Sequence, residues 1–442
     1  MTSLLFKNAQ IVTMDSSRNV IFGNLLIEND QIKAIGDRTF FADKEIDLNG
    51  KIIIPGLIQT HVHLAQTLFR GQADDLALLD WLSKKIWPME AAHDAYTLYY
   101  SALLGICELF RNGTTSIVDM ATVHYTDSVF QAMTETGIRA IGGKCMMDTG
   151  NDVPPRMMES TGKSIQDSVD LLEKWHGSSN NRIQYAFNPR FVLSCSKEML
   201  LEIRDLSEKN QVLIHSHAAE NEDETKAVKQ SFGKGNIHYL ADLGLTGERL
   251  ILAHCIWVDD EELEILKESG TKVVHCPSSN LKLGSGIARI TTMQEMGISI
   301  SLGADGAPCN NNMDPFMEMR LAALLQKPFF GPTAMPAEKA FEMVTLGGAK
   351  AMGLETQIGS IEPGKKADLA ILDLDRAHSI PATGSNIYNR LVYEAQSSDV
   401  VLTMVDGRIV FENGTVQTID EKEVYRGSER LIRKILTRLG AI

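Results

Sequence analysis

The chain of 442 residues lacks paired cysteines, long apolar runs and an excess of basic residues. Its six cysteines are scattered without C-x-x-C spacing, which argues against a disulfide framework or a cysteine zinc ribbon. No stretch of about 18 apolar residues occurs and the start does not resemble a secretory leader, so we expect a cytoplasmic protein. The net charge of −14 argues against nucleic acid or an anionic membrane as the main partner.

Both ends of the chain show short β-like runs separated by turns. The runs are Ala9–Asp15, Asn24–Ile35, Ala367–Asp373 and Val400–Phe411, with turns at Asn29–Asp30 and Asp406–Gly407. This pattern predicts one small β-sandwich domain that is built from both termini, from residues 1–54 and 364–418. Residues 419–442 read as a C-terminal helix whose role the sequence leaves open.

Between these ends, over residues 55–363, short strands alternate with amphipathic helices such as Ser196–Ser207 and Asp259–Glu268. Strand and helix alternation predicts an α/β fold with a parallel sheet. Candidate chemical residues follow several successive strand-like runs. A closed (β/α)8 TIM-like barrel explains their convergence better than an open doubly wound sheet, and no Gly-rich phosphate loop follows any strand.

Imidazole and carboxylate side chains follow several of these predicted strands. The residues are His61, His63, His217, Glu220, His254 and Asp305. Since alternate residues of a strand point to one side, His61 and His63 would face the same cavity. Each segment alone is weak evidence, but together they suit a borderline divalent ion with an open position at which water ionises near neutral pH. The pattern therefore predicts a hydrolytic metal site.

The chain resembles the amidohydrolase superfamily, and within it the aminohydrolases that act on nitrogen heterocycles. The resemblance spans nearly the whole chain and rests on Pro55–His63, the H-x-x-E of His217 to Glu220, His275–Asn280 and Gly359–Asp368. It implies that one metal ion is held by His61, His63, His217 and Asp305, with His254 as a fifth ligand or near-ligand. The carboxylated lysine of binuclear members has no clear counterpart. We expect zinc, although iron would accept the same ligands.

Hydrolytic deamination needs a nucleophilic hydroxide, a proton donor to the ring nitrogen and a second proton for the departing amine. Glu220 is the candidate for both deliveries because it lies three residues after a predicted ligand. Asp305 would take the remaining proton of the nucleophile, and His275 would stabilise the developing negative oxygen. The alternatives are that Glu220 only holds a backbone amide and that His275 only supports a neighbouring side chain.

The substrate motifs point in two directions. Leu68–Leu82, Ile86–Glu90 and Gly303–Asp314 are similar to deaminases of methylthioadenosine, S-adenosylhomocysteine and 5'-deoxyadenosine. The segments that contain Gln66 and Arg190 are similar to guanine deaminase, and a guanidinium with an amide suits a ring that presents a carbonyl. We therefore expect guanine, with 5'-modified adenosines as the alternative. An s-triazine aminohydrolase or chlorohydrolase is a further alternative.

Aromatic residues offer a wall for a flat, purine-like substrate. Trp87 and Phe191 are the predicted stacking residues, whereas core packing is the favoured interpretation of Trp81.

Two other classes of protein stay open. A non-catalytic barrel is disfavoured by the complete ligand set, and an amide-bond hydrolase is disfavoured by the H-x-x-E motif. The relatives implied by the resemblance are commonly dimers or larger, so a homo-oligomer is expected.

Overall fold

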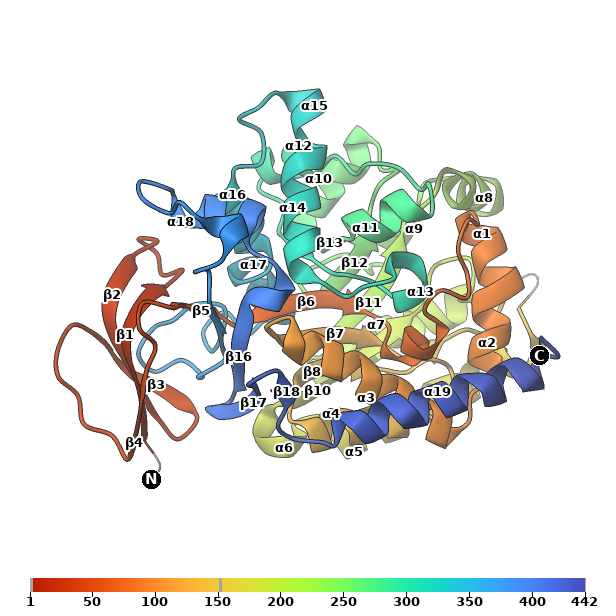
Figure 1. The fold of residues 1–442 in the computed structure, drawn as a ribbon. Coiled ribbons are helices and arrows are strands. Elements are labelled where there is room, and N and C mark those ends of the chain that lie inside the picture. The colour runs from red at the N-terminus through yellow and green to blue at the C-terminus, as the bar shows by residue number, and fades with distance from the viewer. Residues whose placement is uncertain (1–2, 151–152, 442) are drawn as a thin grey trace.

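The computed structural model describes residues 3–150 and 153–441, which form a parallel barrel and a second, mixed sheet (Figure 1). The barrel strands, in order of neighbours, are β6 (Leu57–Val62), β7 (Thr114–Met120), β8 (Arg139–Gly143), β10 (Ile183–Pro189), β11 (Leu213–Ala218), β12 (Leu250–His254), β13 (Lys272–His275) and β14 (Ile300–Leu302). The short β9 (Cys145–Met146) pairs with β10. All these pairings are parallel, so the predicted barrel is confirmed.

The barrel is nearly closed where its first strand, β6, lies beside its last strand, β14. An isolated parallel bridge joins Val62 to Asp305, and the Asp305 backbone N–H donates to the His61 carbonyl oxygen at 3.0 Å. We call this junction the seam. A Cβ atom on Gly303 would lie 2.6 Å from the His61 carbonyl oxygen, so only glycine lets the two segments approach this closely.

Helices follow the barrel strands and cover the outside of the barrel (Figure 1). The longer ones are α3 (Ala95–Arg111), α4 (Thr126–Thr136), α5 (Thr161–Trp175), α7 (Lys197–Asn210), α8 (Glu222–Phe232), α10 (Asp260–Ser269) and α14 (Pro315–Leu325). The shorter ones are α1 (Leu78–Trp81), α2 (Trp87–Ala91), α6 (Ser178–Asn181), α9 (Asn236–Asp242), α11 (Pro277–Lys282), α12 (Ile290–Glu295), α13 (Ala307–Asn310), α15 (Lys327–Phe330), α16 (Ala337–Met343), α17 (Leu346–Met352) and α18 (Ile387–Asn389). The two predicted amphipathic helices are α7 and α10. Each begins after a side chain that caps its free N–H groups, Ser196 for α7 and Asp259 for α10.

The second sheet combines segments from both ends of the chain. Its strands are β1 (Ser3–Val12), β2 (Val20–Glu28), β3 (Gln31–Gly36), β4 (Lys44–Asp47), β5 (Ile52–Pro55), β15 (Leu369–Leu372), β16 (Val400–Val405), β17 (Arg408–Glu412) and β18 (Thr415–Val416). Strand β5 pairs in parallel with β1 and antiparallel with β15, so the two ends meet in one hydrogen-bonded sheet. A separate apolar cluster that includes Phe6, Ile11 and Ile371 forms its core. The domain boundaries given above stay a prediction.

The predicted C-terminal helix is α19 (Glu421–Arg438), which lies along α3 (Figure 1). Its Leu431 and Ile435 pack in one buried cluster with Leu68 and Phe69, which follow the His61-Val62-His63 segment. No helix in the described part of the chain has the length and apolar character that a membrane span needs. All six cysteines are buried and, among the described residues, unpaired.

Candidate active site

The predicted ligands gather at the carboxyl ends of the barrel strands. His61 lies on β6, His217 on β11 and His254 at the end of β12. His63 directly follows β6, and Asp305 comes three residues after the end of β14. Because the strands are parallel, these ends share one face of the barrel. The potential ligand atoms of His61, His63 and His217 lie within 4.8 Å of one another, as do those of His61, His254 and Asp305. The fold thus brings all five predicted ligands together.

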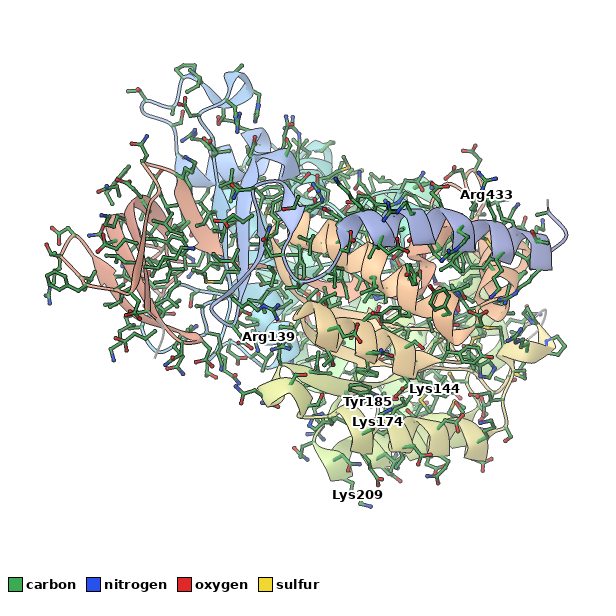
Figure 2. The ribbon with its side chains drawn as sticks, turned by 60° about the horizontal axis from the view of Figure 1, so that its bottom comes forward. Arg139, Lys144, Lys174, Tyr185, Lys209 and Arg433 are labelled. Atoms are coloured by element: carbon green, nitrogen blue, oxygen red, sulfur yellow. The ribbon has the colours of Figure 1, made fainter. Side chains whose placement is uncertain are left out.

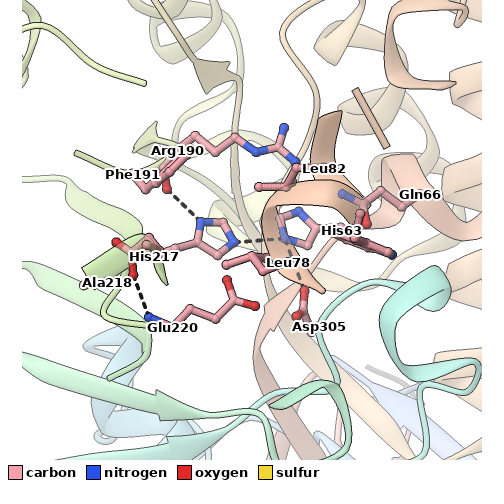
Figure 3. A pocket seen from close by; sticks show the side chains of 12 residues that line it. His63, Gln66, Leu78, Leu82, Arg190, Phe191, His217, Ala218, Glu220 and Asp305 are labelled. Atoms are coloured by element: carbon pink, nitrogen blue, oxygen red, sulfur yellow. Dashed lines mark hydrogen bonds and ion pairs between the residues drawn. The ribbon is translucent and has the colours of Figure 1, made fainter. Parts of the chain in front are cut away.

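The distances between these side chains fit a cation at their centre. Asp305 Oδ1 lies 3.3 Å from the Nε2 atoms of both His61 and His63. His63 Nε2 also lies 3.2 Å from His217 Nε2 (Figure 3). His254 Nε2 is 3.9 Å from Asp305 Oδ2. Among the described residues, the buried Nε2 atoms of His61 and His254 have no hydrogen-bond partner. Buried polar atoms without partners are costly, and a divalent ion with nitrogen and oxygen ligands would satisfy them.

The other ring nitrogen of three histidines is held by a neighbouring group. His63 Nδ1 lies 2.8 Å from the Met120 carbonyl oxygen, and His217 Nδ1 lies 2.7 Å from the Arg190 carbonyl oxygen. A carbonyl only accepts, so Nδ1 carries the proton in both rings and the Nε2 lone pair faces the cluster. His61 Nδ1 lies 2.8 Å from Nε2 of His215, a residue to which the sequence analysis assigned no role. The alternation His215-Ser216-His217 is the signal that could have found it.

The electrostatics of the cluster suit metal ligation. Burial lowers the pKa of His63 to about 4 and the pKa of His217 well below its usual value, so both imidazoles are neutral. Burial opposes the charge of Asp305, but the neighbouring imidazoles, that of His61 above all, hold the pKa of this carboxyl well below its usual range. Neutral imidazoles and an ionised carboxylate are the forms that bind a metal.

Glu220 lies beside the cluster, in the turn between β11 and α8. Its Oε2 atom is 3.6 Å from His254 Nε2, and its side chain lines the same cavity as the histidines. Burial raises the pKa of Glu220 to about 7, so both the acid and the carboxylate are accessible near neutral pH. Its own backbone N–H is held by Glu224 Oε2 at 3.0 Å. Glu220 is therefore placed to gain and lose a proton next to the cluster.

A cavity opens over the cluster (Figure 3). Its lining residues are His63, Gln66, Leu78, Trp81, Leu82, Arg190, Phe191, His217, Ala218, Glu220, Glu224 and Asp305. Of the predicted substrate contacts, Gln66, Arg190, Phe191 and Glu220 line this cavity. Trp87 instead lines an adjacent groove, which shares Phe191 with the cavity. Trp81, which the sequence analysis favoured as core, is buried in one apolar cluster with Trp87 and Phe191 and also lines the cavity.

His275 lies at the end of β13 and is fully buried. Among the described residues neither of its ring nitrogens has a hydrogen-bond partner. Burial lowers the pKa of His275 to about 3, so its ring is neutral and carries one N–H donor.

Arg190 and Gln66 are joined by a residue that the sequence analysis did not single out. The Glu90 carboxylate accepts from Arg190 Nη1 at 3.1 Å, from Arg190 Nη2 at 3.3 Å and from Gln66 Nε2 at 2.9 Å. Thr122 Oγ1 donates to the same carboxylate at 2.9 Å. The Glu90 charge therefore engages the fork of the guanidinium that was expected to bind a ring carbonyl.

A family comparison agrees with this geometry. Residues 52–410 match the model of the Amidohydrolase family. The chain belongs to this family. It is 38% identical over 444 residues to a 5'-deoxyadenosine deaminase of Methanosarcina barkeri, with 100% of both chains covered. It is 37% identical to a 5-methylthioadenosine/S-adenosylhomocysteine deaminase of Desulfitobacterium hafniense, with 93% of this chain and 94% of that protein covered.

A solved structure also matches nearly the whole chain. An adenosine deaminase from Xanthomonas campestris with bound zinc superimposes with a TM-score of 0.92 at 28% identity, and 99% of each chain is covered. The chain is a hydrolase that acts on C–N bonds of cyclic amidines. The family and the zinc-bound neighbour, with the histidine and aspartate cluster, support a divalent metal ion.

The expectation of guanine as the substrate is wrong. Relatives that are 37–38% identical to the chain over at least 93% of its length carry adenosine-type names. The sequence argument for guanine relied on a free guanidinium fork on Arg190, whereas in the structure that fork is bound to Glu90. No local sequence pattern indicates this pair, because Glu90 lies 100 residues before Arg190.

Proposed function

We propose that this protein is a metal-dependent aminohydrolase that releases ammonia from the adenine ring of a 5'-modified adenosine. 5'-Deoxyadenosine, methylthioadenosine and S-adenosylhomocysteine are the candidate substrates. One observation carries the proposal: deaminases named for these nucleosides match the chain at 37–38% identity over at least 93% of its length. The placement of Glu220 beside the cluster supports a deaminase chemistry.

Zinc is the proposed metal. His61, His63, His217 and Asp305 would hold it, with His254 as a further ligand or a close neighbour, because their buried donor atoms converge. When bound, such an ion lowers the pKa of water toward about 7 and so supplies a nucleophile near neutral pH.

The proposed acid and base steps use three residues of the chain. Glu220 donates a proton to the ring nitrogen beside the attacked carbon and then carries a second proton to the departing amine, because its pKa of about 7 allows both forms. Asp305 accepts the proton that the nucleophile still carries, and this is the second proton that Glu220 then passes to the departing amine. The neutral His275 donates its N–H to the developing negative oxygen.

The proposed binding mode places the adenine ring in the cavity. Phe191 is the stacking residue, and Gln66 and Arg190, both held by Glu90, contact polar atoms of the nucleoside. The adjacent groove shares Phe191 with the cavity and also contains Trp87, so it is the proposed place for the 5' substituent.

An assay of ammonia release tests the proposal. The zinc-loaded protein should turn over at least one of the three 5'-modified adenosines, and guanine and melamine serve as the comparison substrates. Turnover of guanine or melamine without any nucleoside activity would overturn the proposed substrate class but not the aminohydrolase activity.

We also propose a homo-oligomer, which light scattering of the purified protein checks.

A further inference from the structure

Three consecutive side chains at the start of α11 contact three different buried groups. Helix α11 (Pro277–Lys282) directly follows β13, and its residues Ser278, Ser279 and Asn280 are buried. Ser278 contacts Glu318, Ser279 contacts Asp305 and Asn280 contacts His254. Two of these three groups belong to the proposed metal site.

Ser279 distinguishes the two oxygens of Asp305. Its hydroxyl donates to Oδ2 at 2.6 Å, while the Gly306 backbone N–H donates to Oδ1 at 2.7 Å. Oδ1 is the oxygen that faces His61 and His63, at 3.3 Å from each Nε2. The terminal torsion of an aspartate is soft, so these two donors together decide which oxygen faces the imidazoles.

Asn280 fixes the ring of His254. Its amide oxygen lies 2.8 Å from His254 Nδ1 and accepts a hydrogen bond there. The proton of the ring is therefore on Nδ1, and the lone pair of Nε2 faces Glu220 Oε2 at 3.6 Å and Asp305 Oδ2 at 3.9 Å. Among the described residues this Nε2 has no hydrogen-bond partner, which leaves it available to a cation.

Ser278 links the start of α11 to α14. Its backbone N–H and its hydroxyl both donate to the buried carboxylate of Glu318 on α14, and Asn310 Nδ2 donates to that carboxylate at 3.0 Å. Ser278 and Ser279 are thus neighbouring buried serines that each donate to a buried carboxylate. Only Ser279 contacts a predicted ligand.

We infer that Ser279 and Asn280 are positioning residues that orient Asp305 and His254 toward a divalent ion. The inference rests on the proposed metal site. Groups that orient metal ligands typically contribute about 10–100-fold to metal affinity or activity. Ser278 has no such effect because its carboxylate partner lies outside the cluster.

The matched pair Ser279→Ala and Ser278→Ala tests the role inferred for Ser279. Both variants of the full-length, zinc-loaded protein lose one hydroxyl that donates to a buried carboxylate, so similar losses of melting temperature are expected. Zinc affinity, measured by competition with a chelator, should fall by about 10–100-fold in Ser279→Ala and by less than about 3-fold in Ser278→Ala. Equal zinc affinities in the two variants would overturn the role of Ser279.

The pair Asn280→Asp and Asn280→Leu tests the role inferred for Asn280 and does not depend on the serine variants. Aspartate keeps an oxygen that accepts from His254 Nδ1, whereas leucine of similar size does not. Zinc affinity should stay within about 3-fold of wild type in Asn280→Asp and fall by about 10–100-fold in Asn280→Leu. Equal zinc affinities in these two variants would contradict the inference for Asn280.

Kinetics separate this inference from the proposed function. On a substrate found in the ammonia assay, Ser279→Ala should lower kcat by about 10–100-fold and leave KM within about 3-fold, because the serine does not line the substrate cavity. The zinc measurement needs no substrate. If no nucleoside is deaminated, the proposed function fails while the zinc affinities still decide the roles of Ser279 and Asn280.

Discussion

Among single residues, buried carboxyl groups dominate the chemistry of this barrel, and their surroundings give them different charges. Asp305 is held ionised by imidazoles, Glu90 accepts four hydrogen bonds from charged and neutral donors, and Glu220 has few partners and a raised pKa. The same functional group can therefore bind a cation, orient a guanidinium or carry a proton. Environment, not residue type, assigns the role.

Replacing Glu220 by glutamine should abolish proton transfer but not metal binding. General acid–base catalysis contributes about 10²–10⁴-fold, so kcat of Glu220→Gln should fall by about that factor. The zinc content should equal that of wild type, because Glu220 is not a predicted ligand. Glu222→Gln, on the exposed start of α8, is the control and should keep wild-type kcat. A Glu220→Gln protein with wild-type turnover and bound zinc would refute the proton-transfer role.

Asp119 gives a pH dependence to stability. Burial raises its pKa to about 7 from 3.8, and only one of its oxygens has a partner among the described residues, the Leu64 N–H at 2.8 Å. A carboxyl with a raised pKa in the folded state stabilises the fold fully below about pH 3.8, and this contribution is lost as pH rises through 7.

The variant Asp119→Asn keeps an oxygen for the Leu64 N–H and removes the charge. Its free energy of unfolding in urea should match wild type near pH 4 and exceed it by on the order of 2–4 kcal/mol at pH 8. Asp205→Asn, with a side chain that is 65% exposed, should show no such trend. An Asp119→Asn difference that does not change with pH would rule out this account.

At the scale of secondary-structure elements, a buried ion-pair network joins the barrel to the mixed sheet. Arg139 at the start of β8 donates to Asp368 through Nε at 2.7 Å and Nη2 at 3.1 Å, and it also pairs with Asp406 in the β16–β17 turn. Figure 2 shows Arg139 at the boundary between the barrel and the mixed sheet. All three side chains are largely shielded from solvent.

Removing Arg139 should destabilise the protein strongly. The variant Arg139→Ala leaves the buried Asp368 carboxylate without its cation, whereas Asp406 still pairs with Arg182 at 3.6 Å. Breaking a buried pair in this way costs about 3–5 kcal/mol. Lys174 on α5, which pairs with Asp127 where both side chains are more than half exposed, is the control (Figure 2). Lys174→Ala should change the free energy of unfolding by at most about 1 kcal/mol. Equal losses in urea unfolding would show that the network contributes no more to stability than an exposed ion pair.

Periodicity predicted the elements well because it reports local burial. The alternation His61-Val62-His63 at the end of β6 and the caps of α7 and α10 could be read directly from the sequence. The directions in which Trp81 and Trp87 point could not be read from the sequence. A π-helical turn at Leu82–Ile86 lies between them and changes the helical periodicity. The Arg190–Glu90 pair was also missed, since no local pattern indicates which distant carboxylate a guanidinium will meet.

At the scale of the whole molecule, metal binding should contribute to stability. A ligand that binds only the folded state stabilises it by about 2.7 kcal/mol at 100 times its Kd. Chelation should therefore lower the melting temperature, and added zinc should restore it. In Asp305→Ala, which lacks one predicted ligand, chelation should have little further effect. A wild-type melting temperature that is indifferent to chelation would argue against the metal site.

The seam has a consequence for how the barrel opens. His61 lies on the first barrel strand and Asp305 follows the last one. An ion held by both side chains would therefore connect the two edges of the barrel at the seam, where strand pairing is incomplete. Loss of the ion would then loosen that junction before the rest of the barrel. The Asp305 amide, which donates to His61, would exchange with deuterium faster in the apoprotein, while amides of β8 and β10 on the far side would keep their protection.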